Sequence, residues 1–291
     1  MSWRRSSWIW SRRRAMASAS VGLQVVPARG WRSGLGHLLR WEGARWWRTR
    51  QWWIHTLLWT TVINGFPGLG FLFWIIPLLP NEGDNGGIPA EAGIEIFVGF
   101  LTTFAAIGVL VVAQGAIVGE KQLGTAAWVL SKPLARSAFI LAKLGANAVA
   151  LFLIMIVLQS ALGYLQLGLR AGAPLALLPF VAALGVMSLN LLFYLTFTVM
   201  LGTFFRSRGP VLGIAGGLLI GGGLVAQLLG RVMPWLPPLL PHRLEAVALA
   251  VARAGADAPL PDQWWLTILL VVAYAAAAVI VALWRFGREE F

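Results

Sequence analysis

The chain has 291 residues, of which 58% are hydrophobic and only 12% are charged, and it contains no cysteine. Soluble domains carry about 25% charged residues, so this composition is that of an integral membrane protein, and it excludes disulfides, thiolate metal sites and cysteine nucleophiles. The formal net charge of +12 favours a nucleic-acid partner only if the basic residues gather on one soluble face.

Residues 1–36 are rich in arginine and serine and contain no acidic residue. They hold no apolar run long enough to cross a bilayer, so we expect a basic, disordered tail in front of a membrane domain that occupies residues 37–291. The same composition also describes an organellar transit peptide, and Met16 offers an alternative start.

The next stretch predicts a helix that lies at the membrane interface, and it reads HLLRWEGARWWRTRQWW over residues 37–53. Leu39, Trp46 and Trp53 are seven residues apart, so on one helix they fall within about 40° of one another. Indole rings favour the headgroup level and arginines reach lipid phosphates. The expected anchor residues are Trp46, Trp47, Arg48, Arg50 and Trp53. The alternative is a flank of the first span without further function.

Six apolar runs follow, and each is long enough to cross about 30 Å of hydrocarbon as a helix. They are residues 54–79, 96–118, 144–169, 175–205, 211–229 and 265–284. If the N-terminus is cytoplasmic, 19 of the 23 lysines and arginines fall on the cytoplasmic side, as the positive-inside rule requires. The basic balance therefore reflects topology, and we expect no nucleic-acid partner.

The spans contain almost no ionisable side chain, so a proton or cation relay for gradient-driven transport is not indicated. Phosphate-loop, zinc-helix and nucleophile-elbow motifs are absent from the sequence, and three histidines in all make a metal site improbable. The neutral polar residues of the spans either form interhelical hydrogen bonds or line a substrate path, and we favour packing. They are Asn64, Gln114, Asn147, Gln159, Asn190 and Gln227.

The fifth run is rich in glycine, and its residues Gly213, Gly217 and Gly221 are spaced four apart. This spacing favours either close helix packing or a helix that bends during a conformational cycle. The segment 231–265 then contains several prolines and one short amphipathic stretch, residues 242–254. We expect a short helix there that dips into or lies on the outer leaflet.

A polar island separates the second run from the third and reads GEKQLGTAAWVLSKPLARSAFILAKLG over residues 119–145. Gly124 and Thr125 interrupt the descending helix, Thr125 is a suitable cap for a short transverse helix, and Pro133 suits the first turn of the ascending helix. Trp128 would then be an apolar knob at the surface. It is flanked by Glu120, Lys121, Lys132 and Arg136. An apolar centre with a charged rim is typical of a protein docking site, and the alternative is a solvated loop.

The island resembles a segment of the permease subunits of type-2 ATP-binding-cassette (ABC) exporters. The shared pattern is E-x-x-x-G-T, a short apolar stretch, S-x-P-x-x-R, and a helix with a lysine near its start. The matching residues are Glu120, Gly124, Thr125, Ser131, Pro133, Arg136 and Lys143. The likeness covers residues 37–291, and the departures are the basic tail and Lys132.

This resemblance implies an all-α integral membrane protein with six transmembrane helices, an N-terminal interfacial helix and short outer re-entrant helices between spans five and six. It further implies that the island is a cytoplasmic coupling helix between spans two and three, which docks on a separate ATP-hydrolysing subunit. The coupling residues would be Glu120, Gly124, Thr125, Trp128, Ser131, Pro133 and Arg136.

The expected assembly contains two ATP-binding subunits, a second permease copy or paralogue, and membrane lipids. ATP and Mg²⁺ would bind to the partner subunits, and this chain would bind no cofactor and catalyse no reaction. We expect a multi-pass protein of a prokaryotic plasma membrane with both termini in the cytoplasm. The alternatives are a channel-like or scaffolding protein and an intramembrane lipid-modifying enzyme, which would need converging acid, base or metal ligands that the spans lack.

Overall fold

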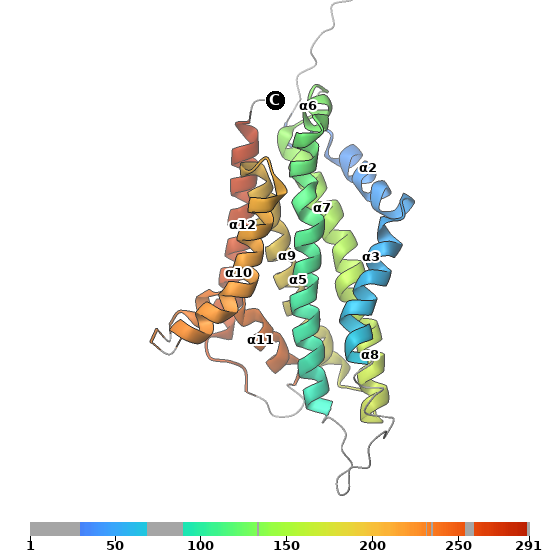
Figure 1. The fold of residues 1–291 in the computed structure, drawn as a ribbon, viewed down its shortest axis with the longest axis vertical. Helices are drawn as coiled ribbons and strands as arrows, with labels where there is room; N and C mark the ends of the chain where they lie inside the picture. Colours follow the sequence, from blue (N-terminus) through green and yellow to red (C-terminus); the bar gives the residue numbers. More distant parts are fainter. Residues whose placement is uncertain are drawn as a thin grey trace, which may run out of the picture.

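Figure 1 shows the computed structural model, which describes residues 30–68, 90–132, 134–230, 232–233, 235–253 and 259–289. Over these residues the secondary structure is entirely helical, which confirms the predicted class. Long helices run side by side between two ends of a bundle (Figure 1). We call these ends the α6 end, after the short helix α6 (Thr125–Leu130), and the α11 end, after α11 (Arg243–Ala252).

Five of the described helices are long and apolar enough to cross a membrane. They are α5 (Ala90–Gln122), the continuous helix formed by α7 (Arg136–Leu151), η2 (Phe152–Val157) and α8 (Leu158–Ala171), α9 (Leu177–Phe204), α10 (Arg208–Leu229) and α12 (Trp264–Gly287). They lie over the second to sixth predicted runs, and several extend beyond them because polar residues at the ends still allow helical hydrogen bonding.

The first predicted run begins as a helix, formed by α3 (Gln51–Thr60) and η1 (Thr61–Gly65). Its second half, residues 69–79, lies outside the part of the chain that the structure describes, so a sixth span stays a prediction. Residues 1–29 of the predicted tail lie outside it as well. The carbonyl of Ser33 accepts the backbone N–H of Ala135 at 3.1 Å, so the last residues before the membrane domain contact the start of α7.

The predicted interfacial helix is shorter than expected, because α2 (Leu35–Arg48) ends before α3 begins. The backbone of Thr49 is extended, with φ −99° and ψ 171°. Its hydroxyl donates to the carbonyl of Arg45 at 2.7 Å, and this bond satisfies an acceptor of the last helical turn while the chain changes direction. The expectation of one continuous helix over residues 37–53 was therefore wrong.

The break also removes the predicted stripe of Leu39, Trp46 and Trp53. Trp46 is only 6% exposed and lies in the interior, whereas Trp53 is exposed on the next helix. Seven-residue spacing places side chains on one face only if the helix is uninterrupted, and Thr49 interrupts it between Trp46 and Trp53.

Exposed tryptophans gather towards both ends of the bundle. Those on α2, α3 and the last turns of α12 are Trp41, Trp47, Trp52, Trp53 and Trp284, and those towards the α11 end are Trp235, Trp264 and Trp265. Along α12, Trp264 and Trp284 are 20 residues apart, which corresponds to about 30 Å of helix, the thickness of a hydrocarbon core. This distribution matches the spacing expected of two aromatic belts at membrane interfaces.

Four of the six predicted polar residues form interhelical hydrogen bonds, and they are Asn64, Asn147, Gln159 and Asn190. Asn64 donates to the side-chain carbonyl of Gln159 at 2.7 Å, and Asn190 donates to the backbone carbonyl of Thr102 at 3.4 Å. These pairs join helices that are distant in sequence. A buried amide without a partner would destabilise the bundle, so these hydrogen bonds favour the observed packing.

The segment between α10 and α12 contains the short turn η3 (Pro237–Leu239) and the predicted amphipathic helix, α11. The apolar face of α11, formed by Leu244, Val247 and Ala248, is buried. It packs against α5 and α9 at the α11 end (Figure 1). The helix itself is confirmed, and its re-entrant placement in a membrane stays a prediction.

The glycines of α10 do not pack closely within the described part of the chain. A Cβ atom built on Gly213, Gly217 or Gly221 would meet no atom within 4 Å. The helix continues without a break from Arg208 to Leu229. Close packing inside one copy is thus excluded for the described residues, and this face of α10 is uncovered.

Candidate functional site: the α6 end

The predicted order of helix, short transverse helix and helix is present at the α6 end (Figure 1). Gly124 lies between α5 and α6 with φ 69°, a left-handed conformation that glycine adopts without steric strain. This residue allows the chain to leave α5 and to start α6 within two residues.

Trp128 is the exposed apolar residue of α6, with 66% of its surface accessible. The ammonium of Lys132 lies 4.9 Å from the centre of the Trp128 ring, and the hydroxyl of Ser131 donates to the Trp128 carbonyl at 2.7 Å. Pro133, the remaining predicted coupling residue in this turn, lies outside the described ranges. The apolar knob is therefore present, held by its own neighbours in sequence.

The predicted ring of charges around Trp128 is only partly formed. Glu120 and Lys121 point into the bundle, since both make buried or half-buried ion pairs there. Arg136 is exposed, yet it donates to backbone carbonyls near the C-terminus. Of the four predicted charges, Lys132 is the one that contacts the Trp128 ring in the described structure. Unpaired charges near an apolar interior find partners, and this explains the difference.

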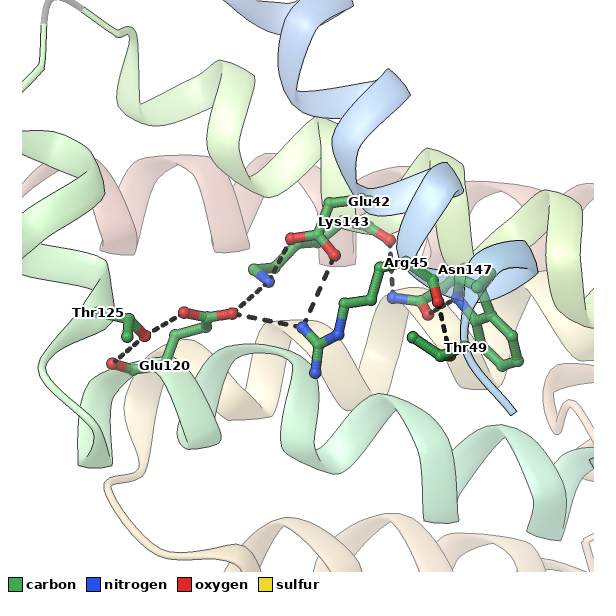
Figure 2. Close-up of polar contacts among 8 residues, drawn as sticks. Glu42, Arg45, Thr49, Glu120, Thr125, Lys143 and Asn147 are labelled. Atoms are coloured by element: carbon green, nitrogen blue, oxygen red, sulfur yellow. Dashed lines mark hydrogen bonds and ion pairs between the residues drawn. The ribbon is translucent and has the colours of Figure 1, made fainter. Parts of the chain in front are cut away.

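Lys143 is the buried centre of an ionic cluster, which we define as Glu42, Arg45, Glu120 and Lys143 (Figure 2). The Lys143 ammonium is 2.6 Å from a carboxylate oxygen of Glu42 and 2.8 Å from one of Glu120. Lys143 is only 1% exposed, and a buried ammonium requires such partners because desolvation of its charge is unfavourable. A guanidinium nitrogen of Arg45 lies 3.7 Å from Glu120. The cluster therefore joins α2, α5 and α7.

The ionic cluster extends into α6 through Glu120. The hydroxyl of Thr125, the first residue of α6, contacts the second carboxylate oxygen of Glu120 (Figure 2). The same hydroxyl lies 3.3 Å from the Glu120 backbone carbonyl. One carboxylate thus connects the start of the transverse helix to Lys143.

A second contact joins α2 to α7 beside the ionic cluster. The indole N–H of Trp46 donates to the side-chain oxygen of Asn147 at 2.9 Å, and the Asn147 amide donates to the Lys143 carbonyl at 2.8 Å. Trp46 was expected at headgroup level, and its N–H is satisfied by protein instead. The other predicted anchor residues are Trp47, Arg48, Arg50 and Trp53, and all four are exposed.

The C-terminal end of α12 contacts α5 and α7 at the α6 end. Arg136 donates to the carbonyls of Gly287 at 2.9 Å and Glu289 at 2.7 Å. Lys121 pairs with the Glu289 carboxylate at 2.8 Å and donates to the Thr203 carbonyl at 2.7 Å. Polar contacts near α6 therefore connect the C-terminal ends of α5, α9 and α12 with the start of α7.

The sequence contains a signal for these pairs that lies in its overall charge distribution and not in any local pattern. The topology that follows from the positive-inside count places only four acidic residues on this side, and they are Glu42, Glu120, Glu289 and Glu290. Lys143 lies seven residues into an apolar helix, where it must find a carboxylate. Glu42 and Glu120 were the available partners, although no local rule could select them.

A comparison with protein families finds a match over residues 49–291, to the family described as ABC-2 family transporter protein. The match includes α3 to α12, and it begins after α2. A comparison with curated proteins found no match. Within the described ranges, no three His, Asp or Glu side chains lie close enough to hold a metal ion.

Proposed function

The chain belongs to the ABC-2 family of transporter proteins, and on this premise we propose that it is the permease subunit of an exporter driven by ATP hydrolysis on a separate subunit. The family makes the chain the membrane component of an ABC transporter, which is not itself catalytic. ATP and Mg²⁺ bind to the partner, and two ATP-binding subunits serve a pair of permeases. The α6 end faces the cytoplasm of a prokaryotic cell.

The observation that carries this proposal is the exposed Trp128 on the short helix α6, whose first residue, Thr125, contacts Glu120 of α5. At 66% exposure, a tryptophan ring outside the apolar helices is an unfavourable contact with water, and covering it would bury apolar area. Aromatic side chains in such positions are common anchors of protein interfaces. We assign Trp128 as the residue that enters a groove of the ATP-binding subunit.

Force applied to α6 would move several helices together. Thr125 contacts Glu120, Glu120 pairs with Lys143, and Lys143 pairs with Glu42. Closure of the ATP-binding subunits would therefore displace α5, α7 and α2 as one unit and shift the permease between inward and outward states. Gly124 supplies the turn between α5 and α6, and we assign Ser131, Pro133 and Arg136 to the same coupling segment.

A second permease copy or paralogue would cover the free face of α10. Gly213, Gly217 and Gly221 leave space on this face for another helix to approach its backbone. A bulky Gly217→Leu change is tolerated by the single chain, because nothing lies within 4 Å of its Cβ position. We expect this variant to keep its fold and to lose dimers in chemical cross-linking, with Gly287→Leu, also without a close neighbour, as the control.

The coupling role is tested by affinity purification in the native host. The wild-type chain should copurify an ATP-binding subunit and stimulate its ATPase activity, and Trp128→Ala should lose at least about tenfold in apparent affinity, as expected for an interface anchor. The matched control is Trp235→Ala, since Trp235 is 61% exposed at the opposite end of the bundle. Gly124→Ala should insert and copurify, yet show reduced stimulation.

Three results contradict the proposal. Copurification that depends on Trp235 and not on Trp128 would place the partner at the α11 end. A purified chain that transports at full rate without an ATP-binding subunit would favour a channel. Labelling of residue 128 from outside intact cells would reverse the topology.

A further inference from the structure

A cavity of about 420 Å³ lies beside the ionic cluster, and no step of the coupling proposal uses it. Its walls come from α2, α3, α5, α7 and the first residue of α10. Ionisable and amide side chains are prominent among its lining residues. They include Arg45, His55, Gln114, Lys143 and Arg208.

The charges around this cavity leave a positive excess. Lys143 is matched by Glu42 and Glu120, and Arg45 shares the same two carboxylates at 4.0 and 3.7 Å. Arg208 has no ion pair among the residues that the structure describes. Lys143 and Arg45 therefore share two carboxylates, whereas the Arg208 guanidinium has no counter-charge within the described ranges.

The Arg208 guanidinium lies close to two glycines of α5. A Cβ atom added to Gly115 or Gly119 would lie 3.9 or 3.7 Å from the guanidinium, so the side chain lies along a flat, glycine-lined surface. Arg208 is also the first residue of α10, where backbone N–H groups carry partial positive charge, and no side chain caps that end. Both features favour an anion here.

Two buried polar atoms in the same walls have no hydrogen-bond partner in the described structure. They are Nδ1 of His55 and the side-chain oxygen of Gln114. A buried polar atom without a partner destabilises a structure unless a ligand or water satisfies it. The His55 imidazole can donate from Nδ1. Rotation of the Gln114 side-chain amide by half a revolution exchanges its oxygen for the N–H₂ group, which then faces the cavity. The cavity therefore offers donors beside an unmatched guanidinium.

We propose that this cavity binds the phosphate group of an anionic membrane lipid. Guanidinium groups bind phosphate oxygens through paired, charge-assisted hydrogen bonds. The lipid origin follows from the surroundings. Val111 lines the cavity and is 48% exposed. Leu58, one turn beyond His55 on α3 and outside the cavity lining, is exposed to the same extent. The exposed Trp52 and Trp53 belong to the adjacent turn of α3, where indoles favour headgroup level.

The site is tested with the full chain purified in a neutral detergent. Native mass spectrometry counts bound dioctanoyl phosphatidylglycerol and dioctanoyl phosphatidylcholine in separate titrations. We expect phosphatidylglycerol to bind at least about tenfold more tightly, which is the equivalent of one charge-assisted hydrogen bond. Arg208→Gln should remove this preference, and Arg206→Gln, an equal loss of charge two residues away and outside the cavity, should keep it.

A second variant protects the test against a folding defect of Arg208→Gln. Gly115→Leu fills the cavity without changing its charge, and its Cβ meets no atom closer than 3.9 Å. It should bind phosphatidylglycerol as weakly as Arg208→Gln does while keeping the wild-type melting temperature. Equal binding of the two lipids, or equal loss in Arg206→Gln and Arg208→Gln, overturns the site. Displacement of the lipid by millimolar inorganic phosphate overturns the lipid origin.

Discussion

Replacing Lys143 by methionine should strongly destabilise the bundle. Each of the two ion pairs of Lys143, at 2.6 and 2.8 Å, has a Coulomb energy of about 6 kcal/mol at an effective dielectric constant of about 20. Desolvation of the three charges offsets most of that energy. Removal of one partner nevertheless costs about 3 to 5 kcal/mol, because the remaining charges stay buried without compensation.

In Lys143→Met the uncompensated groups are the carboxylates of Glu42 and Glu120. Arg45 can move towards them, since its side chain is about half exposed, so we expect the lower end of the range, about 3 kcal/mol. In a domain of this size, that loss lowers the melting temperature by about 6 to 12 °C. Thermal unfolding of the detergent-purified chain, followed by tryptophan fluorescence, measures it.

Two further variants decide whether the burial of charge causes the effect. Lys132→Met removes an exposed lysine whose ammonium lies over the Trp128 ring, and it should change stability by less than about 1 kcal/mol. The triple variant Glu42→Gln, Glu120→Gln, Lys143→Met removes every buried charge of the two pairs and should regain at least half of the loss. The reasoning is refuted if Lys143→Met unfolds at the wild-type temperature, or if the triple variant is no more stable than Lys143→Met.

Three other predictions concern single side chains, each measured by the same thermal assay. Phe139→Ala removes a ring stacked on Phe286 at 5.4 Å between centroids and should cost about 3 kcal/mol, whereas Phe204→Ala, at a partly exposed site, should cost less. Gly124→Ala must adopt φ 69° and should lose about 1 kcal/mol, with Gly209→Ala, at a position of ordinary φ, as the reference. Burial, with Glu95 nearby, raises the pKa of the Glu245 carboxyl above its usual range, so its stabilising contribution is complete below the unfolded pKa of about 4.5 and is lost as pH rises through the folded pKa. Glu245→Gln should therefore be more stable than wild type at pH 7 and no more stable near pH 4, and an equal difference at both values would contradict this.

The ionic cluster explains why a lysine is compatible with a helix that is otherwise apolar. A methionine at position 143 would suit the hydrocarbon better, yet Lys143 fixes α2 and α5 relative to α7 through directional contacts. Apolar packing alone restricts the rotation of these helices less strictly, because dispersion contacts are weakly directional. A buried ion pair can thus set geometry even where it adds little net stability.

The sequence alone determined where the long apolar helices lie and that the chain turns at Gly124, whereas it did not indicate the break at Thr49. A span needs a run of apolar residues whose length matches the bilayer, and a turn such as that at Gly124 needs a residue that tolerates a positive φ. Both conditions depend on neighbours in the chain. The five long helices, α6 and α11 were therefore predictable, together with the exposure of Trp128.

Only the tertiary structure decided which side chains meet. Glu42 lies 101 residues before Lys143, and the pair forms because α2 packs on α7 and brings the two side chains to the same depth. The inward turn of Trp46 and the uncovered glycine face of α10 have the same origin. Such contacts depend on the relative rotation and height of whole helices, and those are set by the sum of many packing interactions between segments far apart in the chain, which no local pattern encodes.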